Sequence, residues 1–315
     1  MSDEKQEPTT AITLDIEPHR MTGAIVDSEG SVDAIHSLPM PLNEGSQAII
    51  ETIVVLCKRL KENAPATVRG VGISTVGLVH HRSGKILHAE ADLSILQDLP
   101  LAEAVASVIH LPTRVENRVN AMAMAEAHLG AGQACDSFYY IFADETLNGA
   151  IMQNGGIWHG SHFSAGQIAH LVAGWMSQKP ITLSQKASGS GIASEYSMRS
   201  RKFRVPAIRD ILQYAKHGDQ LAIRVVRDGA YLLASVLSPV VSLLDPQRVI
   251  VGGILLQNGD LWWQTFTDTL RASPLPALQQ VDVQQAQIKD NAALIGAAML
   301  ILKGDTVPNA SANQE

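Results

Sequence analysis

The sequence has few cysteines and no excess of basic residues, and each shortage excludes a class of protein. Cys57 and Cys135 are the only two cysteines in 315 residues, and they lie far apart and outside any CxxC or Cys/His spacing. Neither a disulfide framework nor a thiolate zinc site is therefore expected, and a reducing compartment suits the chain. The 24 Lys and Arg residues against 31 Asp and Glu residues give a net charge of -7, which argues against a nucleic-acid-binding surface.

Signals for export and for membrane insertion are also missing. The N-terminal stretch MSDEKQEPTT is polar and acidic, whereas a signal peptide has a basic start and then an apolar run. The longest apolar tract, YLLASVLSPVVSLL, contains Pro239 and is shorter than the roughly 20 residues of a bilayer span. A chain of 315 residues, 46% of them hydrophobic, can fill the cores of two lobes of ordinary size. We therefore expect a soluble cytoplasmic protein with no membrane partner.

The N-terminal third is predicted to run β-β-β-α-β-α-β. A meander of three strands is expected over 11–18, 20–27 and 31–40. Ser46 is then expected to cap an amphipathic helix, whose apolar face includes Cys57. The remaining elements are a strand over 68–75, a hairpin over 77–87, a helix over 99–110 and a strand that ends at Glu116.

The rest of the chain repeats this theme more loosely. The patterns predict a helix from Val119 to Leu129, strands over 137–144, 147–155, 170–175 and 248–253, and helices over 220–244 and 291–304. The last helix is rich in alanine and glycine, which permits close packing. Since ligands in α/β proteins lie where the chain leaves the carboxyl end of a strand, we expect Asn117 and Arg118 to face a cleft.

Three stretches resemble the ROK family (repressor, open reading frame, kinase): GVGISTVGLV, SAGQIAHLV and VENRVNAMAMAEAHLGAG. In that family, the third stretch has Asn-Asp before an alanine-rich helix that ends in Gly-Ala-Gly. The resemblance extends from about residue 11 to about residue 303. It implies an α/β protein with the two-lobed actin-like ATPase (ribonuclease H-like) fold, and a homodimer.

The resemblance also implies a division of the chain. Residues 11–117 and the helix over 291–304 would form a small lobe, and residues 118–290 a large lobe. Residues 1–10 and 305–315 are expected to be disordered. Repressor members of the family place a winged helix-turn-helix before the first strand, and about ten residues precede it here, so no direct binding of nucleic acid is expected.

The first turn that would hold the ATP phosphates has changed. The family has Asp-Ile-Gly-Gly-Thr where this chain has Asp15 to His19. Asp15, which the resemblance assigns to metal positioning, is kept. Glu17 adds a carboxylate where phosphate would lie, and Pro18 removes an N–H donor.

The second phosphate turn, a Gly-Thr-Gly run in the family, contains Asp144 and Glu145 here. At about 4 Å and an effective dielectric near 20, each like-charge contact costs roughly 4 kcal/mol. Weak or absent ATP binding is the expectation, and no cofactor is assigned. Gly252 and Gly253, where the family packs the nucleoside, keep the expected form.

The residue that begins the alanine-rich helix is the most altered. Asn117 matches the family, but Arg118 stands where the sugar kinases have the aspartate that takes a proton from the sugar hydroxyl. A guanidinium stays protonated and cannot be a general base, so no catalytic residue is assigned. Glu116 is the nearest substitute, although an ion pair with Arg118 is its preferred interpretation.

The stretch SAGQIAHL resembles the family turn Ala-Gly-Glu-Ile-Gly-His, whose Glu and His hold sugar hydroxyls. Gln167 replaces the Glu, His170 is kept, and Ser184 falls where a further glutamate follows the zinc loop. That loop has no cysteine here, so no metal is expected. His159 and His162 are alternative ligands, but the preferred explanation of both is that they are polar side chains facing solvent in a glycine-rich turn.

The changes Asp to Arg, Glu to Gln and Glu to Ser alter the pocket charge by roughly +4. The sequence thus predicts a pocket for a small sugar or an anionic sugar such as a sugar phosphate, held by Asn117, Arg118, Gln167 and His170. A closed pocket that binds nothing is an equal alternative.

Three functions follow from these predictions. The first is a non-catalytic sugar-binding regulatory protein. The second is an ATP- and magnesium-dependent hexose or N-acetylhexosamine kinase that uses Glu116 or Asp144 as its base. The third is a structural partner that dimerises with an intact relative.

Overall fold

The computed structural model describes residues 8–65, 68–201, 204–257, 260–272 and 275–304. Their contacts divide the chain into two compact units. Of the described residues, the first unit contains 8–134, 153–165 and 290–304, and the second contains 135–152 and 166–289. The stretches 1–7 and 305–315, for which disorder was expected, lie outside the described residues, whereas Thr10 is already part of a strand. Residues 118–134 and 153–165 thus group with the N-terminal part of the chain, whereas the sequence-based division placed them in the large lobe.

The first unit is built on a mixed sheet with the strand order β3-β2-β1-β4-β7. Its first three strands form the predicted antiparallel meander, and the last two run parallel to β1. The strands are β1 (Thr10–Ile16), β2 (Arg20–Asp27), β3 (Val32–Pro39), β4 (Val68–Thr75) and β7 (Thr113–Asn117). The predicted order β-β-β-α-β-α-β is therefore confirmed for this unit.

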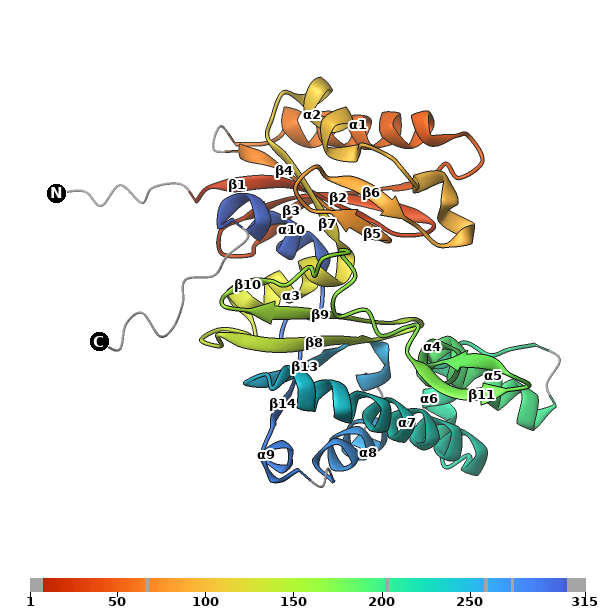
Figure 1. Ribbon diagram of the computed structural model, residues 1–315. Coiled ribbons are helices and arrows are strands. Elements are labelled where there is room, and N and C mark those ends of the chain that lie inside the picture. Colours follow the sequence, from red (N-terminus) through yellow and green to blue (C-terminus); the bar gives the residue numbers. More distant parts are fainter. Residues whose placement is uncertain (1–7, 66–67, 202–203, 258–259, 273–274, 305–315) are drawn as a thin grey trace, which may run out of the picture. The chain divides into compact units, whose positions relative to one another are not determined.

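Helices cover both faces of this sheet (Figure 1). On one face lie α1 (Ser46–Glu62) and α2 (Leu101–Ile109), and on the other lie α3 (Arg118–Leu129) and α10 (Ala292–Leu302). Of the predicted apolar face of α1, Ile49, Ile53 and Cys57 are completely buried. The N-cap of this helix is Gly45, and the predicted cap Ser46 is its first helical residue. A Cβ added at Gly296 would overlap the carbonyl of Ala121, which confirms the close packing expected of the last helix.

A small hairpin and a short 3-10 helix complete the first unit. They are β5 (Leu78–His80), β6 (Lys85–His88) and η1 (Ala91–Leu96).

Strand register brings polar side chains of the first unit to one edge of the sheet. Asp15 on β1 pairs with Ser74 on β4, and Ser74 pairs in turn with Glu116 on β7. One step further along, Thr75 pairs with Asn117. Because these three strands are parallel, their carboxyl ends meet at the same edge.

The second unit has a sheet with the order β9-β8-β13-β14, in which β13 runs parallel to both β8 and β14. Its strands are β8 (Ser137–Ala143), β9 (Leu147–Gln153), β13 (Arg248–Gly252) and β14 (Asp282–Gln285), whereas the short β10 (Gly156–Ile157) is in the 153–165 segment of the first unit. The long helix α7 (Gln220–Leu244) packs along α8 (Asp260–Arg271), whose Trp262 and Phe266 are buried (Figure 1).

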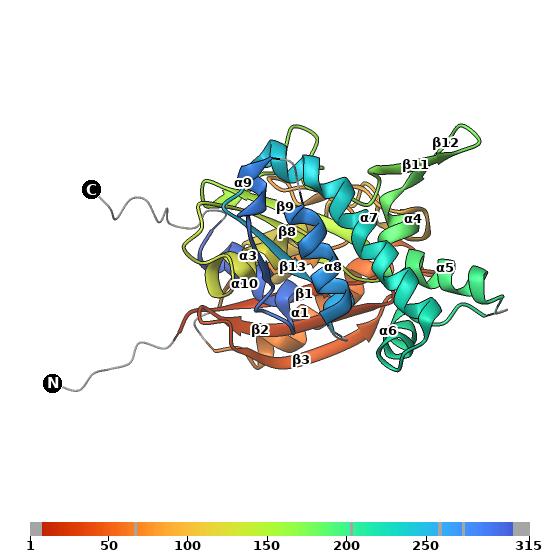
Figure 2. The same cartoon turned by 90° about the horizontal axis from the view of Figure 1, so that it is seen from below.

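Several short elements of the second unit were not predicted. The predicted strand near 170–175 is β11 (Val172–Met176), and it forms a projecting hairpin with the unpredicted β12 (Lys179–Thr182) (Figure 2). A capping box of Thr182 and Gln185 begins the helix that follows. The other unpredicted elements of this unit are the strand β14, the helices α4 (Leu183–Ala187), α5 (Gly189–Ser200), α6 (Ile208–Lys216), α8 and α9 (Pro276–Gln279), and the 3-10 helix η2 (Ile254–Leu256).

Within the described part of the chain, α7 is the one helix long and apolar enough to cross a membrane by length and composition. It is longer than the apolar tract seen in the sequence, because it begins at Gln220. A core helix of a soluble protein passes the same test, and Leu233, Leu237 and Val241 are completely buried.

Candidate functional site

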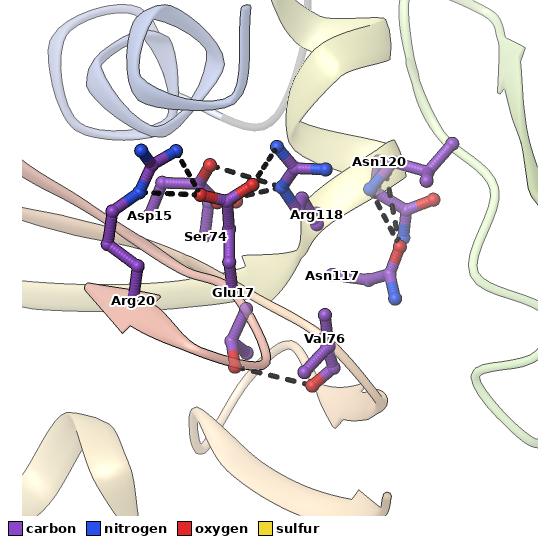
Figure 3. Close-up of polar contacts among 10 residues, drawn as sticks. Asp15, Glu17, Arg20, Ser74, Val76, Asn117, Arg118 and Asn120 are labelled. Carbon is purple, nitrogen blue, oxygen red and sulfur yellow. Dashed lines mark hydrogen bonds and ion pairs between the residues drawn. The ribbon is translucent and has the colours of Figure 1, made fainter. Parts of the chain in front are cut away.

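Arg118 is the first residue of α3, directly after the strand β7 (Figure 3). The side chain of Asn117 caps this helix, because its Oδ1 accepts hydrogen bonds from the N–H groups of Val119 and Asn120. The N-terminus of a helix carries a partial positive charge, so a guanidinium there is unfavourable unless anions compensate for it.

Two carboxylates at the end of β1 provide this compensation. Arg118 Nε donates to Asp15 Oδ1 and Oδ2 at 3.0 and 3.1 Å, and Arg118 Nη2 donates to Glu17 Oε1 at 3.1 Å. Arg20 holds the other oxygen of Glu17, with Nη2 at 2.7 Å from Oε2. The formal charges of these four side chains sum to zero, and Figure 3 shows the two guanidinium groups on either side of Glu17.

This network alters the charge balance predicted for the pocket. The predicted increase of about four charges counted Arg118 as an uncompensated cation and left out Glu17. Because Asp15 and Glu17 pair with the guanidinium, its attraction for an anionic ligand is strongly reduced.

Asp15 is 7% exposed and also accepts a hydrogen bond from the Ser74 hydroxyl at 2.9 Å. Burial raises the pKa of Asp15 above its usual value, and the negative charge of Glu17 acts in the same direction. The positive charge of Arg118 and the hydrogen bonds from Ser74 and Arg118 oppose that rise. The position that the resemblance assigns to metal positioning is thus occupied by an internal ion pair.

Glu116 does not have the expected role as the ion-pair partner of Arg118. Its Oε1 accepts from the Asn117 N–H at 2.7 Å and from Asn120 Nδ2 at 2.8 Å. Its Oε2 lies 2.7 Å from Nε2 of His159. Glu116 is 3% exposed, because partners from β7, α3 and the 153–165 segment surround its carboxylate. The predicted ion pair between Glu116 and Arg118 was therefore wrong.

The second unit contains the other acidic turn, between β8 and β9. Asp144 Oδ1 accepts from the Glu145 N–H at 2.8 Å, and Asp144 Oδ2 accepts from the Ile254 N–H at 2.9 Å. The N–H groups of Gly189 and Ser190, in the first turn of α5, donate to the carbonyls of Asp144 and Glu145. The Ser190 hydroxyl lies 3.2 Å from Glu145 Oε2 and donates to it. Carboxylates of the chain therefore use donors that a phosphate would need.

Gly252 and Gly253 end β13 close to this turn. Gly253 has φ +111, and an added Cβ would overlap the carbonyl of Ala143. Glycine is needed there because the two backbones touch. The next helical turn, η2, contributes Leu255 to a cavity of about 200 Å³. The side chains that line the cavity are Leu212, Ala215, Lys216, Val226, Leu255, Asp260, Leu261 and Trp262.

Three predicted sugar-binding residues lie near one another in the second unit. Gln167 and His170 are on the loop before β11, and Ser184 is on α4. The Ser184 N–H donates to the carbonyl of Ala169 at 3.0 Å, which joins α4 to that loop. Gln167 and Ser184 are half-buried, and His170 is exposed.

The described residues contain no group of three or more His, Cys, Asp or Glu side chains that could hold a metal ion. His159 is not the surface residue that the sequence suggested, because it is bound to the buried Glu116. No pattern in the sequence marks this pair, since 43 positions separate its members.

The fold of both units and the polar edge of the first sheet define an α/β protein with the actin-like ATPase fold. The family profile of the ROK family matches residues 11–304, and the chain belongs to this family. Among its relatives, it is 26% identical to a glucokinase of Halalkalibacterium halodurans, over 88% of this chain and 90% of that one. It is 27% identical to an N-acetylmannosamine kinase of Shigella boydii, over 92% and 98%.

A solved structure extends this comparison. A ROK family glucokinase from Streptomyces griseus, in complex with glucose and AMPPNP, matches with a TM-score of 0.78 and 25% identity. The match covers 94% of this chain and 100% of that chain.

Proposed function

We propose that this ROK protein binds a small sugar or sugar phosphate and does not transfer phosphate, so that it acts as a regulatory protein. The observation that carries the proposal is the pairing of Arg118 with Asp15 and Glu17. A guanidinium at the head of α3 cannot accept a proton, and it engages the carboxylate that the resemblance assigns to the metal. Phosphoryl transfer depends on positioning and electrostatic stabilisation, and this arrangement removes both.

The second unit supports the same conclusion. The carboxylate of Asp144 accepts the N–H of Ile254, and Glu145 accepts the Ser190 hydroxyl. A triphosphate at this turn would have to displace or repel two acids. No cofactor is therefore proposed.

The ligand class follows from the relatives and from the charges. The relatives are named for hexoses and N-acetylhexosamines, so we expect a sugar of that size. Because the charges of Arg118, Arg20, Asp15 and Glu17 cancel, a neutral sugar is favoured over its phosphate.

Thermal-shift and calorimetric titrations test this function. The natural chain would be measured with glucose, N-acetylmannosamine, N-acetylglucosamine and their 6-phosphates, each with and without magnesium ATP. We expect at least one sugar to raise the melting temperature and ATP to leave it unchanged. Sugar-dependent release of ADP at an ordinary kinase rate would overturn the proposal.

The second candidate function is a hexose or N-acetylhexosamine kinase with magnesium ATP and an atypical active site. The cavity that follows Gly253 favours it, because the resemblance places the nucleoside there. Against it, the carboxylates of Glu116 and Asp144 already accept two or more hydrogen bonds each. A coupled assay for sugar-dependent ADP release separates the two candidates.

We further propose a cytoplasmic homodimer with neither a membrane nor a nucleic acid as its partner. The acidic net charge of -7 supports the last point, and the family resemblance supports the dimer. Light scattering of the purified chain tests the oligomeric state. If the chain purified from its host carried a second ROK protein, the role of a structural partner would be favoured.

A further inference from the structure

A sugar hydroxyl donates one hydrogen bond, so a sugar site needs acceptors as well as donors. The first unit has lost acceptors beside Asn117. Arg118 has none, and Asn117 Oδ1 accepts two N–H groups of α3. Asp15 and Glu116 are 7% and 3% exposed and are bound by neighbouring donors.

His159 offers an acceptor at this place. Its Nε2 lies 2.7 Å from Oε2 of Glu116, the residue directly before Asn117 in the chain. A carboxylate accepts and does not donate, so the proton between the two atoms is assigned to Nε2. In the neutral ring, Nδ1 then has a lone pair. Nδ1 has no protein partner among the described residues, and it is not sealed from solvent.

The ring of His159 is also held in place. His81, which follows β5, stacks on it with ring centroids 3.9 Å apart and an interplanar angle of 13°. Phe163 contacts His81 and His80, at centroid distances of 5.7 and 4.6 Å. The carboxylate at one edge and the stacked ring on one face leave the imidazole little rotational freedom, which lowers the entropy cost of a hydrogen bond to a ligand.

We infer that His159 is a sugar-binding residue, oriented by Glu116, whose Nδ1 accepts a hydrogen bond from a hydroxyl of a neutral sugar. It supplies the acceptor that was lost when Arg118 took the position of a carboxylate. Glu116 is a positioning residue, because it fixes the tautomer of the ring and does not touch the ligand. The inference deepens the proposed function and rests on it.

Titration of glucose and N-acetylmannosamine into the natural chain, His159→Gln and Glu116→Gln tests the inference, with His162→Gln as the control. A glutamine amide at position 159 can still donate to Glu116 but lacks the ring acceptor. A glutamine at position 116 can donate to Nε2, which moves the ring proton to Nδ1. We expect both variants to bind about tenfold more weakly, and the double variant to bind no more weakly than either single one, because the two residues act as one unit. The exposed His162 lies on the same segment, and its variant should match the natural chain.

The outcomes separate the inference from the function on which it rests. If the natural chain binds a sugar, and His159→Gln keeps the same affinity, the inference is wrong and the sugar-binding function stands. If neither sugar binds to the natural chain, the proposed function fails for this ligand class and the inference fails with it. Glu116→Gln gives a second reading in case His159→Gln lowers the melting temperature.

Discussion

Arg118 Nε donates a bifurcated hydrogen bond to both carboxylate oxygens of Asp15, at 3.0 and 3.1 Å. Asp15 is the last residue but one of β1, and Arg118 begins a helix 103 residues later. The pair places a permanently charged guanidinium against the carboxylate that the family resemblance assigns to metal positioning.

Replacing Arg118 by alanine should lower the free energy of unfolding by about 3 kcal/mol, because Asp15 would be left as a buried carboxylate without its cation. Urea unfolding followed by circular dichroism measures this change. Arg20→Ala is the matched control, since its side chain is 60% exposed and its pair with Glu17 should contribute at most about 1 kcal/mol. Equal losses in the two variants would show that the buried pair has no special weight.

Restoring the family aspartate alone should not restore a kinase. The Arg118→Asp variant keeps Glu17 and Pro18 in the first phosphate turn and Asp144 and Glu145 in the second. A triphosphate would therefore still have no binding site. We expect sugar-dependent ADP release to stay at the background of the natural chain. A coupled assay with glucose and magnesium ATP measures it, and a rise of a hundredfold or more would mean that the acidic turns do not exclude ATP.

Asp144→Ala should destabilise the second unit by about 1–2 kcal/mol. The substitution leaves the N–H groups of Ile254 and Glu145 without the acceptors that they have now. Asp268, an exposed residue of α8, is the control, and its alanine variant should change the free energy of unfolding by less than about 0.5 kcal/mol. Hydrogen exchange at Ile254 gives a local readout, and unaltered protection there would contradict the assigned bond.

His128 should make the protein less stable in acid. Burial, and then the charge of Lys303, lower the pKa of His128 to about 4, and its Nε2 is buried without a hydrogen-bond partner. The unfolded chain binds a proton near pH 6.5 while the folded chain does not, so stability is lost as pH falls from about 6.5 to about 4.

Because His128 is partly exposed, its share of that loss should be about 1 kcal/mol. His128→Gln should flatten this part of the curve of unfolding free energy against pH, and His110→Gln serves as the control. A curve that does not change in His128→Gln would assign the acid sensitivity to other groups.

The sequence predicted those parts of the fold that have a strong periodic pattern. The meander, the apolar face of α1, the parallel strands β4 and β7, and the packing of α10 through Gly296 were all visible in it. The elements that were missed include the four-residue strands β12 and β14 and the helices α4, α5, α6, α8 and α9. The capping residues Thr182 and Gln185 were a usable signal for α4.

The sequence predicted where the site residues lie in the fold better than it predicted which side chains they contact. Asn117 and Arg118 lie at the predicted junction of a strand and a helix, but the partner of Arg118 was wrong. Sequence neighbours suggested Glu116, whereas strand register brings Asp15 and Glu17 to the guanidinium. The bond between Glu116 and His159 depends on how a distant loop packs, which local patterns do not encode.

The first unit uses segments from both ends of the chain, since α10 covers β1 and β4. While the ribosome is still adding residues 292–302, that side of the sheet has only α3 over it. The residues of the second unit are all translated before α10, so this unit can fold first. A nascent chain stalled short of residue 292 would present the uncovered apolar side of β1 to chaperones and proteases.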